Sequence, residues 1–325
     1  MSIPVNDEHA TGYRAREVPG PMPVIDGVWA VPVPLHGSPL RSIVVYLIET
    51  AEGLILIDAG YEHPSCWASF QESLAQMGHG LGSIRLVLLT HNHPDHVGFA
   101  DRVRDASGAR VVMGLADDFA HQEDERGGFL AQLRNSLALT GAPADVVATM
   151  YAQAVKVAHH AEDLELDVVL TENTDFTLGE VTVRAVHAPG HTYGHTVYVD
   201  TRGLVFTGDT MMAEGPTQLA IPSLAGDNPA ADLFATLDRI RDLDVDIACP
   251  AHQFAYRDVA ARAEELKVFH QTEAVAVHAL MKEHSTAWEI APRLPRDKPW
   301  AELGDGTKRF ALIHTLALMR AGTVG

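Results

Sequence analysis

The stretch Thr90-His91-Asn92-His93-Pro94-Asp95-His96 decides both the fold and the chemistry that this sequence predicts. It follows the run Ile-Arg-Leu-Val-Leu-Leu-Thr at 84–90, which is typical of a buried strand. It also opens a helix expected over about 94–107, since proline is favoured at the first position of a helix. Three imidazoles and one carboxylate within six residues suit a divalent cation of borderline softness such as zinc. The stretch therefore predicts a metal-binding loop between a strand and a helix.

Other acidic residues and histidines follow strand-like runs elsewhere in the chain. Loops held by a rigid scaffold are the usual home of catalytic groups. A sandwich of sheets could gather all of these side chains along one edge, so we expect them to meet the metal-binding loop. These residues, each with the run that precedes it, are Asp58 after 54–57, His191 and His195 after 181–187, Asp209 after 204–207, and His252 after 247–249.

The order of the expected elements predicts a layered α/β body. The β-branched runs 43–48 and 54–57 are separated by five residues that include Gly53, which indicates a hairpin. Strands in two clusters, with helices between and outside them, favour sheets covered by helices. We expect an irregular arm over 1–23, the body over 24–260 with a mostly helical insertion at about 116–162, and a small helical, winged-helix-like region over 261–325.

Composition narrows the function further. The chain has 325 residues, of which 46% are hydrophobic, and this content excludes disorder. With 24 Lys and Arg against 43 Asp and Glu, its net charge of −19 disfavours nucleic-acid binding through bulk charge. No apolar run approaches the roughly 18 residues of a membrane span, and we see no secretory signal. The two cysteines, Cys66 and Cys249, provide no disulfide framework, so we expect a cytoplasmic protein.

These motifs together resemble the metallo-β-lactamase-fold hydrolases. Five landmarks of that superfamily occur in order between about residues 24 and 260: the Asp58 turn, the loop at 90–96, and the segments around His191, Asp209 and His252. The C-terminal helical part is similar to that of the LACTB-like branch, which is related to glyoxalase II-like enzymes. The resemblance implies an αββα sandwich with a helical insertion.

The resemblance also implies how these residues would hold two divalent ions, with zinc expected and iron or manganese as alternatives. Such a pair lowers the pKa of a shared water and so produces a hydroxide that attacks an electrophilic carbonyl. Asp95 and Asp209 would be catalytic, and Asp95 would orient the nucleophile. Asp58 and His195 would hold other residues in place without binding metal. The implied ligands are His91, His93 and His191 for one ion, Asp95, His96 and His252 for the second, and Asp209 between the two.

The implied reaction is hydrolysis of a small carboxylic derivative: a thioester, an ester or a lactone. The substrate would be a small molecule or a carrier-bound acyl group, with no nucleic-acid or membrane partner. Met212 stands where related lactonases usually place a tyrosine, which weakens the lactone reading. Whether the apolar residues near the site line a substrate pocket or only pack beneath it stays open. The candidate pocket residues are Met211, Met212, Tyr193, Phe119 and Phe129.

Two other functions remain open at this point. One is a single-strand-specific endoribonuclease of the LACTB-like type, which a modest basic cluster in the C-terminal region would serve. The other is an iron-dependent oxidoreductase of the persulfide dioxygenase type, since such relatives bind iron in the same scaffold. The basic cluster consists of Arg293, Arg296, Lys298, Lys308 and Arg309.

Overall fold

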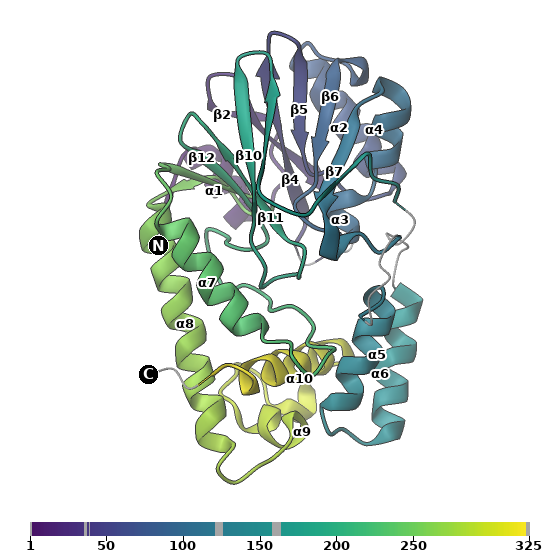
Figure 1. The fold of residues 1–325 in the computed structure, drawn as a ribbon, viewed down its shortest axis with the longest axis vertical. Helices are drawn as coiled ribbons and strands as arrows, with labels where there is room; N and C mark the ends of the chain where they lie inside the picture. The colour runs from purple at the N-terminus through teal and green to yellow at the C-terminus, as the bar shows by residue number, and fades with distance from the viewer. Residues whose placement is uncertain (1, 36–37, 39, 121–125, 158–163, 323–325) are drawn as a thin grey trace.

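The computed structural model describes residues 2–35, 38, 40–120, 126–157 and 164–322, and its strands form two seven-stranded sheets (Figure 1). In the first sheet the strands follow one another in chain order. The pairs from β2 to β5 are antiparallel, and those from β5 to β8 are parallel. Its strands are β2 (Met22–Ile25), β3 (Val28–Pro34), β4 (Ser42–Thr50), β5 (Gly53–Ile57), β6 (Ile84–Leu88), β7 (Arg110–Gly114) and β8 (Val168–Leu170).

The second sheet has the order β1-β14-β13-β12-β11-β10-β9. Only β12 and β13 pair in parallel, and β1, from the N-terminus, lies at the edge beside β14. Parallel neighbouring strands end at the same edge of a sheet. The loops that follow them therefore lie side by side at that edge. Its strands are β9 (Thr174–Leu178), β10 (Val181–His187), β11 (Thr196–Asp200), β12 (Leu204–Gly208), β13 (Ile247–Pro250), β14 (Tyr256–Arg257) and β1 (Ile3–Pro4).

Alternation of side chains along β4 explains why the first sheet is buried on both faces. Successive strand residues point to opposite faces. Val45 and Leu47 pack with the helices outside the first sheet, whereas Tyr46 and Ile48 lie in the core between the sheets. The six central residues of β4, 43–48, are all apolar, so both faces remove hydrophobic area from water.

Helices cover the outer faces of the two sheets, which gives the αββα layers that the resemblance implied (Figure 1). Phe70 of α2 and Phe99 beside α4 stack outside the first sheet with ring centroids 4.9 Å apart. Leu233 and Leu237 of α7 pack against α8 outside the second sheet. These helices are α2 (Pro64–Gln76), η1 (Leu81–Ser83), α3 (Pro94–Val97) and α4 (Ala100–Ser107) on the first sheet, and α1 (Asp7–Ala15), α7 (Pro229–Arg241) and α8 (Val259–Leu280) on the second.

The remaining helices form a separate helical group below the sheets in the view of Figure 1. Leu133 and Leu137 from the insertion pack with Leu312 and Ile313 near the C-terminus, so both regions share one hydrophobic core. This core joins segments that lie far apart in the chain. The group comprises α5 (Phe129–Leu139), α6 (Ala144–Val157), α9 (Ala287–Ile290), η3 (Ala291–Arg293), η4 (Trp300–Glu302) and α10 (Asp305–Met319). The short helix η2 (Leu115–Asp117) follows β7 directly.

Three expectations need correction or stay open. The segment expected to be an irregular arm holds β1 and α1, the latter capped by the Asn6 side chain, which accepts from His9 N. The helix expected over 94–107 is split into α3 and α4, because Gly98 N donates to Gly60 O and a Cβ there would meet Glu62 N. Residues 258–322 contain helices and no strand, and 323–325 lie outside the described residues, so winged-helix character is not confirmed.

The search for a membrane span gave a negative result. In the described parts of the chain, no helix is both long enough and apolar enough to cross a bilayer.

Candidate metal centre

The residues of the site follow strands that end at one edge of the sandwich. Asp58 follows β5 and His91 follows β6, and these two strands pair in parallel. Asp209 and His252 follow β12 and β13, the parallel pair of the second sheet. The sheets are tied together at this edge, because the Tyr46 hydroxyl donates to Pro250 O at 2.8 Å. The fold therefore brings four separate loops to one place.

One group of ligand atoms gathers around His93. Its Nδ1 lies 2.8 Å from Nε2 of His91 and 3.2 Å from Nε2 of His191. With a carboxylate oxygen of Asp209, these nitrogens all lie within 4.8 Å of one another. Two nitrogen lone pairs do not approach this closely without a proton or a cation between them, so the group has the geometry of a cation site.

A second group gathers beside it. Nε2 of His252 lies 3.5 Å from Oδ2 of Asp95, and Nε2 of His96 lies 3.9 Å from Oδ1 of the same carboxylate. His96 and His252 are fully buried, whereas the Asp95 side chain remains 20% exposed. The group therefore has one face open toward solvent.

Asp209 stands between the two groups and presents one carboxylate oxygen to each. Its Oδ2 lies 3.6 Å from Nε2 of His191 in the first group. Its Oδ1 lies 3.5 Å from Nε2 of His96 and 3.4 Å from Nε2 of His252 in the second. The structure thus brings together all seven residues that the resemblance implied as ligands.

Buried polar atoms without a hydrogen-bond partner indicate whether these residues fit metal ions. Nε2 of His96, Nε2 of His252 and Oδ1 of Asp209 are buried and have no hydrogen-bond partner among the described residues. Leaving a buried polar atom unpaired costs about 1–3 kcal/mol, and these three atoms face one another. Lone pairs of two imidazoles and a carboxylate directed at one point are what a divalent cation requires. The residues present therefore fit divalent metal ions.

The opposite ring nitrogens of the histidines are held by neighbouring groups, which fixes the direction in which the ligand atoms point. Nδ1 of His191 lies 2.8 Å from Gln218 O, and Nδ1 of His252 lies 2.9 Å from Ser42 O. The Thr90 hydroxyl lies 3.0 Å from Nδ1 of His91.

Asp58 and His195 lie behind the ligands. Asp58, in a left-handed backbone conformation with φ of 60°, accepts from Thr90 N at 2.8 Å. Its Oδ2 lies 2.8 Å from Nδ1 of His96, so this carboxylate positions both the loop and a ligand. His195 accepts from Asp209 N at 3.3 Å through Nε2 and lies 3.1 Å from the Thr210 hydroxyl through Nδ1. Both of its ring nitrogens are therefore occupied outside the centre.

Burial and neighbouring charges shift the pKa values of the candidate ligands in different directions. Burial alone would lower the pKa of His96, but the carboxylates of Asp58, Asp209 and Asp95 outweigh it and raise that pKa to about 10. Burial, with His191 nearby, lowers the pKa of His93 to about 3. Burial would raise the pKa of Asp209, yet the surrounding histidines, His252 first, hold it below its usual range. The bridging carboxylate is therefore ionised and ready to bind a cation.

Asp117 is a residue of the site that sequence reasoning missed. It is buried and accepts from the Thr192 hydroxyl at 2.5 Å and from Gly194 N at 2.9 Å, while Asn92 donates to its backbone carbonyl at 3.0 Å. It thereby joins the loop of His93 to the loop of His191. Burial, partly offset by these hydrogen bonds, raises its pKa to about 6. The available signal was its place soon after β7, as Asp58 follows β5.

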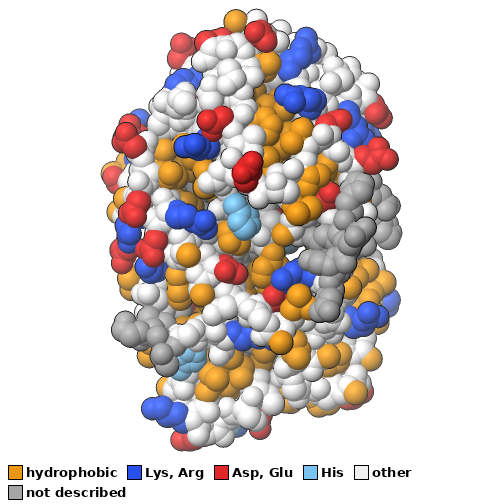
Figure 2. All heavy atoms as spheres, in the orientation of Figure 1, with side chains coloured by type: hydrophobic (Ala, Val, Ile, Leu, Met, Phe, Trp, Pro, Cys, Tyr) orange, Lys and Arg blue, Asp and Glu red, His pale blue; other side chains and the backbone are white. Residues whose placement is uncertain are grey.

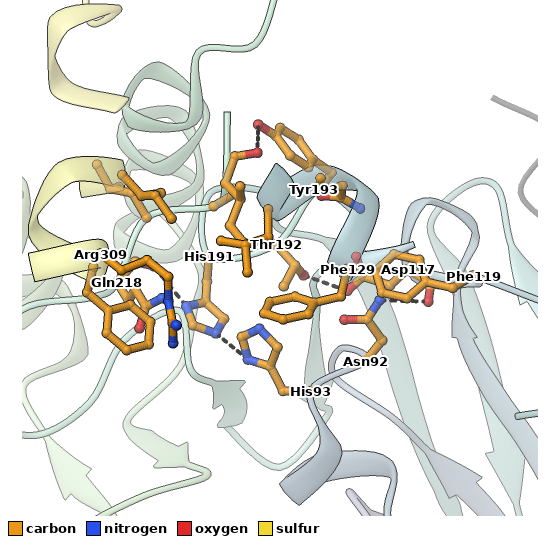
Figure 3. A pocket seen from close by; sticks show the side chains of 17 residues that line it. Asn92, His93, Asp117, Phe119, Phe129, His191, Thr192, Tyr193, Gln218 and Arg309 are labelled. Carbon is orange, nitrogen blue, oxygen red and sulfur yellow. Dashed lines mark hydrogen bonds between the residues drawn. The ribbon is translucent and has the colours of Figure 1, made fainter. Parts of the chain in front are cut away.

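A cavity of about 60 Å³ opens beside His93 and His191 (Figure 3). Its walls come from the insertion, from the segment around Gln218 and from α10, so three distant parts of the chain enclose it. Phe119, Phe129 and Tyr193, which were candidates for a pocket, line it. Its other lining residues are Asn92, Asp117, Gln132, Leu133, Thr192, Gln218, Leu219, Ala220, Ile221, Arg309, Phe310 and Ile313.

The two methionines after Asp209 lie elsewhere. Met211 is completely buried in the core outside the second sheet, and its carbonyl accepts from the Thr207 hydroxyl at 2.8 Å. Met212 is half-buried, and its carbonyl accepts from Nε of Arg262 at 2.9 Å. Neither lines the cavity, because the turn that begins at Asp209 directs them away from it. Packing, the other role left open for them, is observed for Met211, whereas the sulfur of Met212 lies 3.9 Å from Nε2 of Gln253.

Comparisons with known proteins agree with this geometry. The family model of the metallo-beta-lactamase superfamily matches residues 39–252. The probable metallo-hydrolase YqjP of Bacillus subtilis is 28% identical over 286 residues, which cover 83% of this chain and 85% of that protein. A hydroxyacylglutathione hydrolase of Cereibacter sphaeroides is 28% identical over 171 residues, about half of each chain (52% and 48%).

A solved structure extends the likeness over most of the chain. A metallo-beta-lactamase family protein from Thermus thermophilus superposes with a TM-score of 0.72 and is 25% identical, covering 92% of this chain and 93% of that one. The family match spans well over half of the sequence and includes every residue of the two ligand groups. The expected fold is confirmed, and the chain belongs to the metallo-beta-lactamase superfamily.

Proposed function

We propose that this protein is a dinuclear metal-dependent hydrolase that cleaves a small carboxylic derivative: a thioester, an ester or a lactone. The observation that carries the proposal is the position of Asp209, whose two oxygens lie 3.4–3.6 Å from ligand nitrogens of two different groups. A carboxylate with one oxygen in each of two adjacent sites is suited to hold a pair of ions at a fixed spacing.

When bound, two such ions would supply an activated water and polarisation of the substrate carbonyl. The chain's own groups prepare that chemistry. Asp95 is the ligand carboxylate with an exposed face, so it is placed to orient the attacking water and to take its proton. His195 holds Asp209 through the backbone, and Asp58 holds His96, so neither carboxylate nor imidazole needs to move during the reaction.

The donor set supports zinc as the ion. Five imidazoles and two carboxylates are ligands that zinc accepts readily, and no thiolate is among them. Iron and manganese also accept imidazole and carboxylate and remain the alternatives. An iron-loaded centre would be required for the oxidoreductase function, so the metal found in the purified protein separates these cases.

The cavity supports a small organic substrate. Aromatic rings of Phe119, Phe129 and Phe310 line it together with the amides of Asn92 and Gln218, a mixture that suits an acyl chain with a polar end. A related protein is named a hydroxyacylglutathione hydrolase, which makes acyl derivatives the first class to test. A small molecule or a carrier-bound acyl group is therefore the proposed partner.

The endoribonuclease function has weaker support. Arg296 donates to Ala291 O and lies over the Trp300 ring, and Arg293 donates to Glu289 O, so these two cations make local contacts. On the face drawn in Figure 2, the described Lys and Arg side chains lie in small groups among acidic and apolar ones. A continuous basic track is the feature that a nucleic-acid groove needs.

Metal content and turnover test the proposal together. Protein purified without added metal is analysed for zinc, iron and manganese, then assayed on a thioester, ester and lactone panel and on a short RNA. We expect about two equivalents of metal and turnover on the carboxylic panel, with both lost in His93→Ala. His79→Ala is the matched control, because His79 pairs with Glu49 outside the centre. Salt-sensitive RNA cleavage, or oxygen uptake with iron, would contradict the proposal.

A further inference from the structure

Among the described residues that line the cavity, Arg309 is the one lysine or arginine. It belongs to α10 and shares the wall with Phe310 and Ile313 from the same helix. Figure 3 shows it among the lining side chains, together with Gln218 and the ligand His191. Its position, next to the candidate reaction centre and apart from the ligands, is that of a group that contacts substrate.

The charge of Arg309 has no acidic partner within 4.0 Å in the described part of the chain. Its one hydrogen bond runs from Nη1 to the carbonyl of Met150 at 3.1 Å. Burial lowers its pKa, with no carboxylate to offset that effect. Arg126, which lies over the Tyr193 ring, shows the contrast: its two terminal nitrogens donate to Asp227 at 2.8 and 2.9 Å. Arg126 is thus paired with a carboxylate, whereas Arg309 has a backbone carbonyl and the Phe310 ring, whose centroid lies 5.4 Å from its guanidinium carbon.

The rest of the cavity does not neutralise this charge. Of the lining residues in the part of the chain that the structure describes, Asp117 alone is acidic, and its two carboxylate oxygens already accept from Thr192 and Gly194. The other polar side chains there are neutral or are candidate metal ligands. A positive group is thus held in a small cavity of a chain whose net charge is −19. A half-buried guanidinium without a counter-charge is the expected feature of a site that binds an anion.

We propose that Arg309 binds an anionic group of the substrate, so that the preferred substrates are acyl derivatives carrying a carboxylate or a phosphate at a distance from the bond that is cleaved. This inference rests on the proposed function and specifies its substrate class. The aromatic side chains of Phe119, Phe129 and Phe310 would contact the apolar segment between the two ends. The anion can belong to the acyl part or to the leaving thiol, and both arrangements place it in the same cavity.

Kinetics on matched thioesters test the proposal. Three substrates share one chain length: a neutral one, one with a carboxylate on the acyl part, and one with a carboxylate on the thiol. In Arg309→Gln we expect kcat/KM to fall about 10- to 100-fold for a carboxylate-bearing substrate, mainly through KM, and to change less than about threefold for the neutral one. Arg309→Lys should recover part of the loss, and the arm that responds identifies which end carries the anion.

The matched control is Lys308→Gln, which removes the same charge from the neighbouring position of α10 without touching the cavity. It should leave all three substrates within about twofold of the wild type. An equal loss in Lys308→Gln would mean that overall charge, not Arg309, attracts the anion. An equal loss of neutral and charged substrates in Arg309→Gln would mean that Arg309 only supports the wall. Either result overturns the proposal.

A binding measurement separates this inference from the proposed function. Non-hydrolysable amides of the same neutral and carboxylate-bearing chains are titrated calorimetrically into wild type and Arg309→Gln. A carboxylate preference of the wild type that disappears in Arg309→Gln supports the anion site even if no thioester is hydrolysed, in which case only the proposed reaction fails. Equal binding of the charged amide by both proteins rejects the anion site, whatever the enzyme hydrolyses.

Discussion

In the part of the chain that the structure describes, histidine and carboxylate side chains gather in two places, the metal centre and a second cluster, and the two differ in how their polar atoms are hydrogen-bonded. In the metal centre, ring nitrogens of His96 and His252 and one oxygen of Asp209 face one another without a hydrogen bond. In the second cluster, between α8 and α10, one oxygen of Glu273 lies 3.0 Å from Nδ1 of His270 and 3.1 Å from Nε2 of His314. The first has buried polar atoms without a hydrogen-bond partner at its centre, whereas in the second the atoms that face the centre are hydrogen-bonded.

The difference shows that residue composition alone does not make a metal site. Both clusters bring ligand atoms within 4.8 Å of one another. At the metal centre, backbone carbonyls of Ser42 and Gln218 occupy the outer ring nitrogens and turn the inner ones toward one point. In the second cluster the unpaired atom is Nε2 of His270, the ring nitrogen that is not bonded to Glu273. We therefore expect metal in the first cluster and a hydrogen-bonded connection between helices in the second.

The largest effect should come from removing a ligand at the metal centre. His252→Ala takes away one of the three unmet atoms and the histidine nearest to Oδ1 of Asp209. We expect metal content to fall and hydrolysis to drop about a thousandfold or more, because bound metal supplies several kcal/mol of transition-state stabilisation. Elemental analysis and thioester turnover measure both. Full activity in this variant would contradict the expectation that the first cluster, and not the second, binds the catalytic metal.

A smaller effect should follow from loosening a ligand that remains present. Asp58→Ala removes the carboxylate that holds His96 and the Thr90 backbone. Loss of such a supporting group typically weakens metal affinity about 10- to 100-fold, and we expect that range here. Competition with a chelator gives the affinity, and circular dichroism checks that the variant is folded. Unchanged affinity would reduce Asp58 to a turn residue.

Glu273→Gln should leave the metal centre untouched and affect stability only. Metal content and turnover should match the wild type, whereas the free energy of unfolding should fall by about 1 kcal/mol, since two partly exposed hydrogen bonds weaken. Urea denaturation of chelator-treated protein measures the change. If metal content instead falls by a whole equivalent, the second cluster binds an ion and the comparison fails.

The effect of Glu273→Gln should also depend on pH. Burial would raise the pKa of Glu273, but hydrogen bonds to His270 and His314 outweigh it and lower that pKa from 4.5 to about 2. A carboxylate with a lowered pKa stabilises the fold fully above about pH 4.5, and this contribution is lost as the pH falls toward 2. The difference in stability between wild type and variant should therefore shrink between pH 7 and 3, without vanishing at pH 3. A constant difference over that range would contradict the lowered pKa.

Local patterns predicted the hairpin of β4 and β5 and the strands that precede the site residues, because each depends on a few neighbouring residues, but they did not predict β1, β2, β3, β9 or β14. The division of the ligands into two groups came from the resemblance. The split between α3 and α4 was not predictable, since it depends on the close approach of Gly98 to Glu62. For a similar reason Asp117 was missed as a site residue, and Arg309 was named only as part of a basic cluster and not as a residue of the cavity. Asp117 acts through contacts with residues some 75 positions away, and Arg309 reaches the cavity only because α10 packs on the insertion. Contacts between residues so far apart in the chain produce no local sequence pattern from which they could be predicted.

The candidate metal ligands and part of the cavity wall come from different regions of the sequence. Every candidate ligand lies between residues 91 and 252, whereas the cation and two apolar residues of the cavity wall come from a helix encoded more than fifty residues later. Under the proposed roles, exchanging α10 between homologues would alter which substrates are bound while keeping the metal ligands unchanged. A fold arranged in this way can acquire new substrates through changes in one helix.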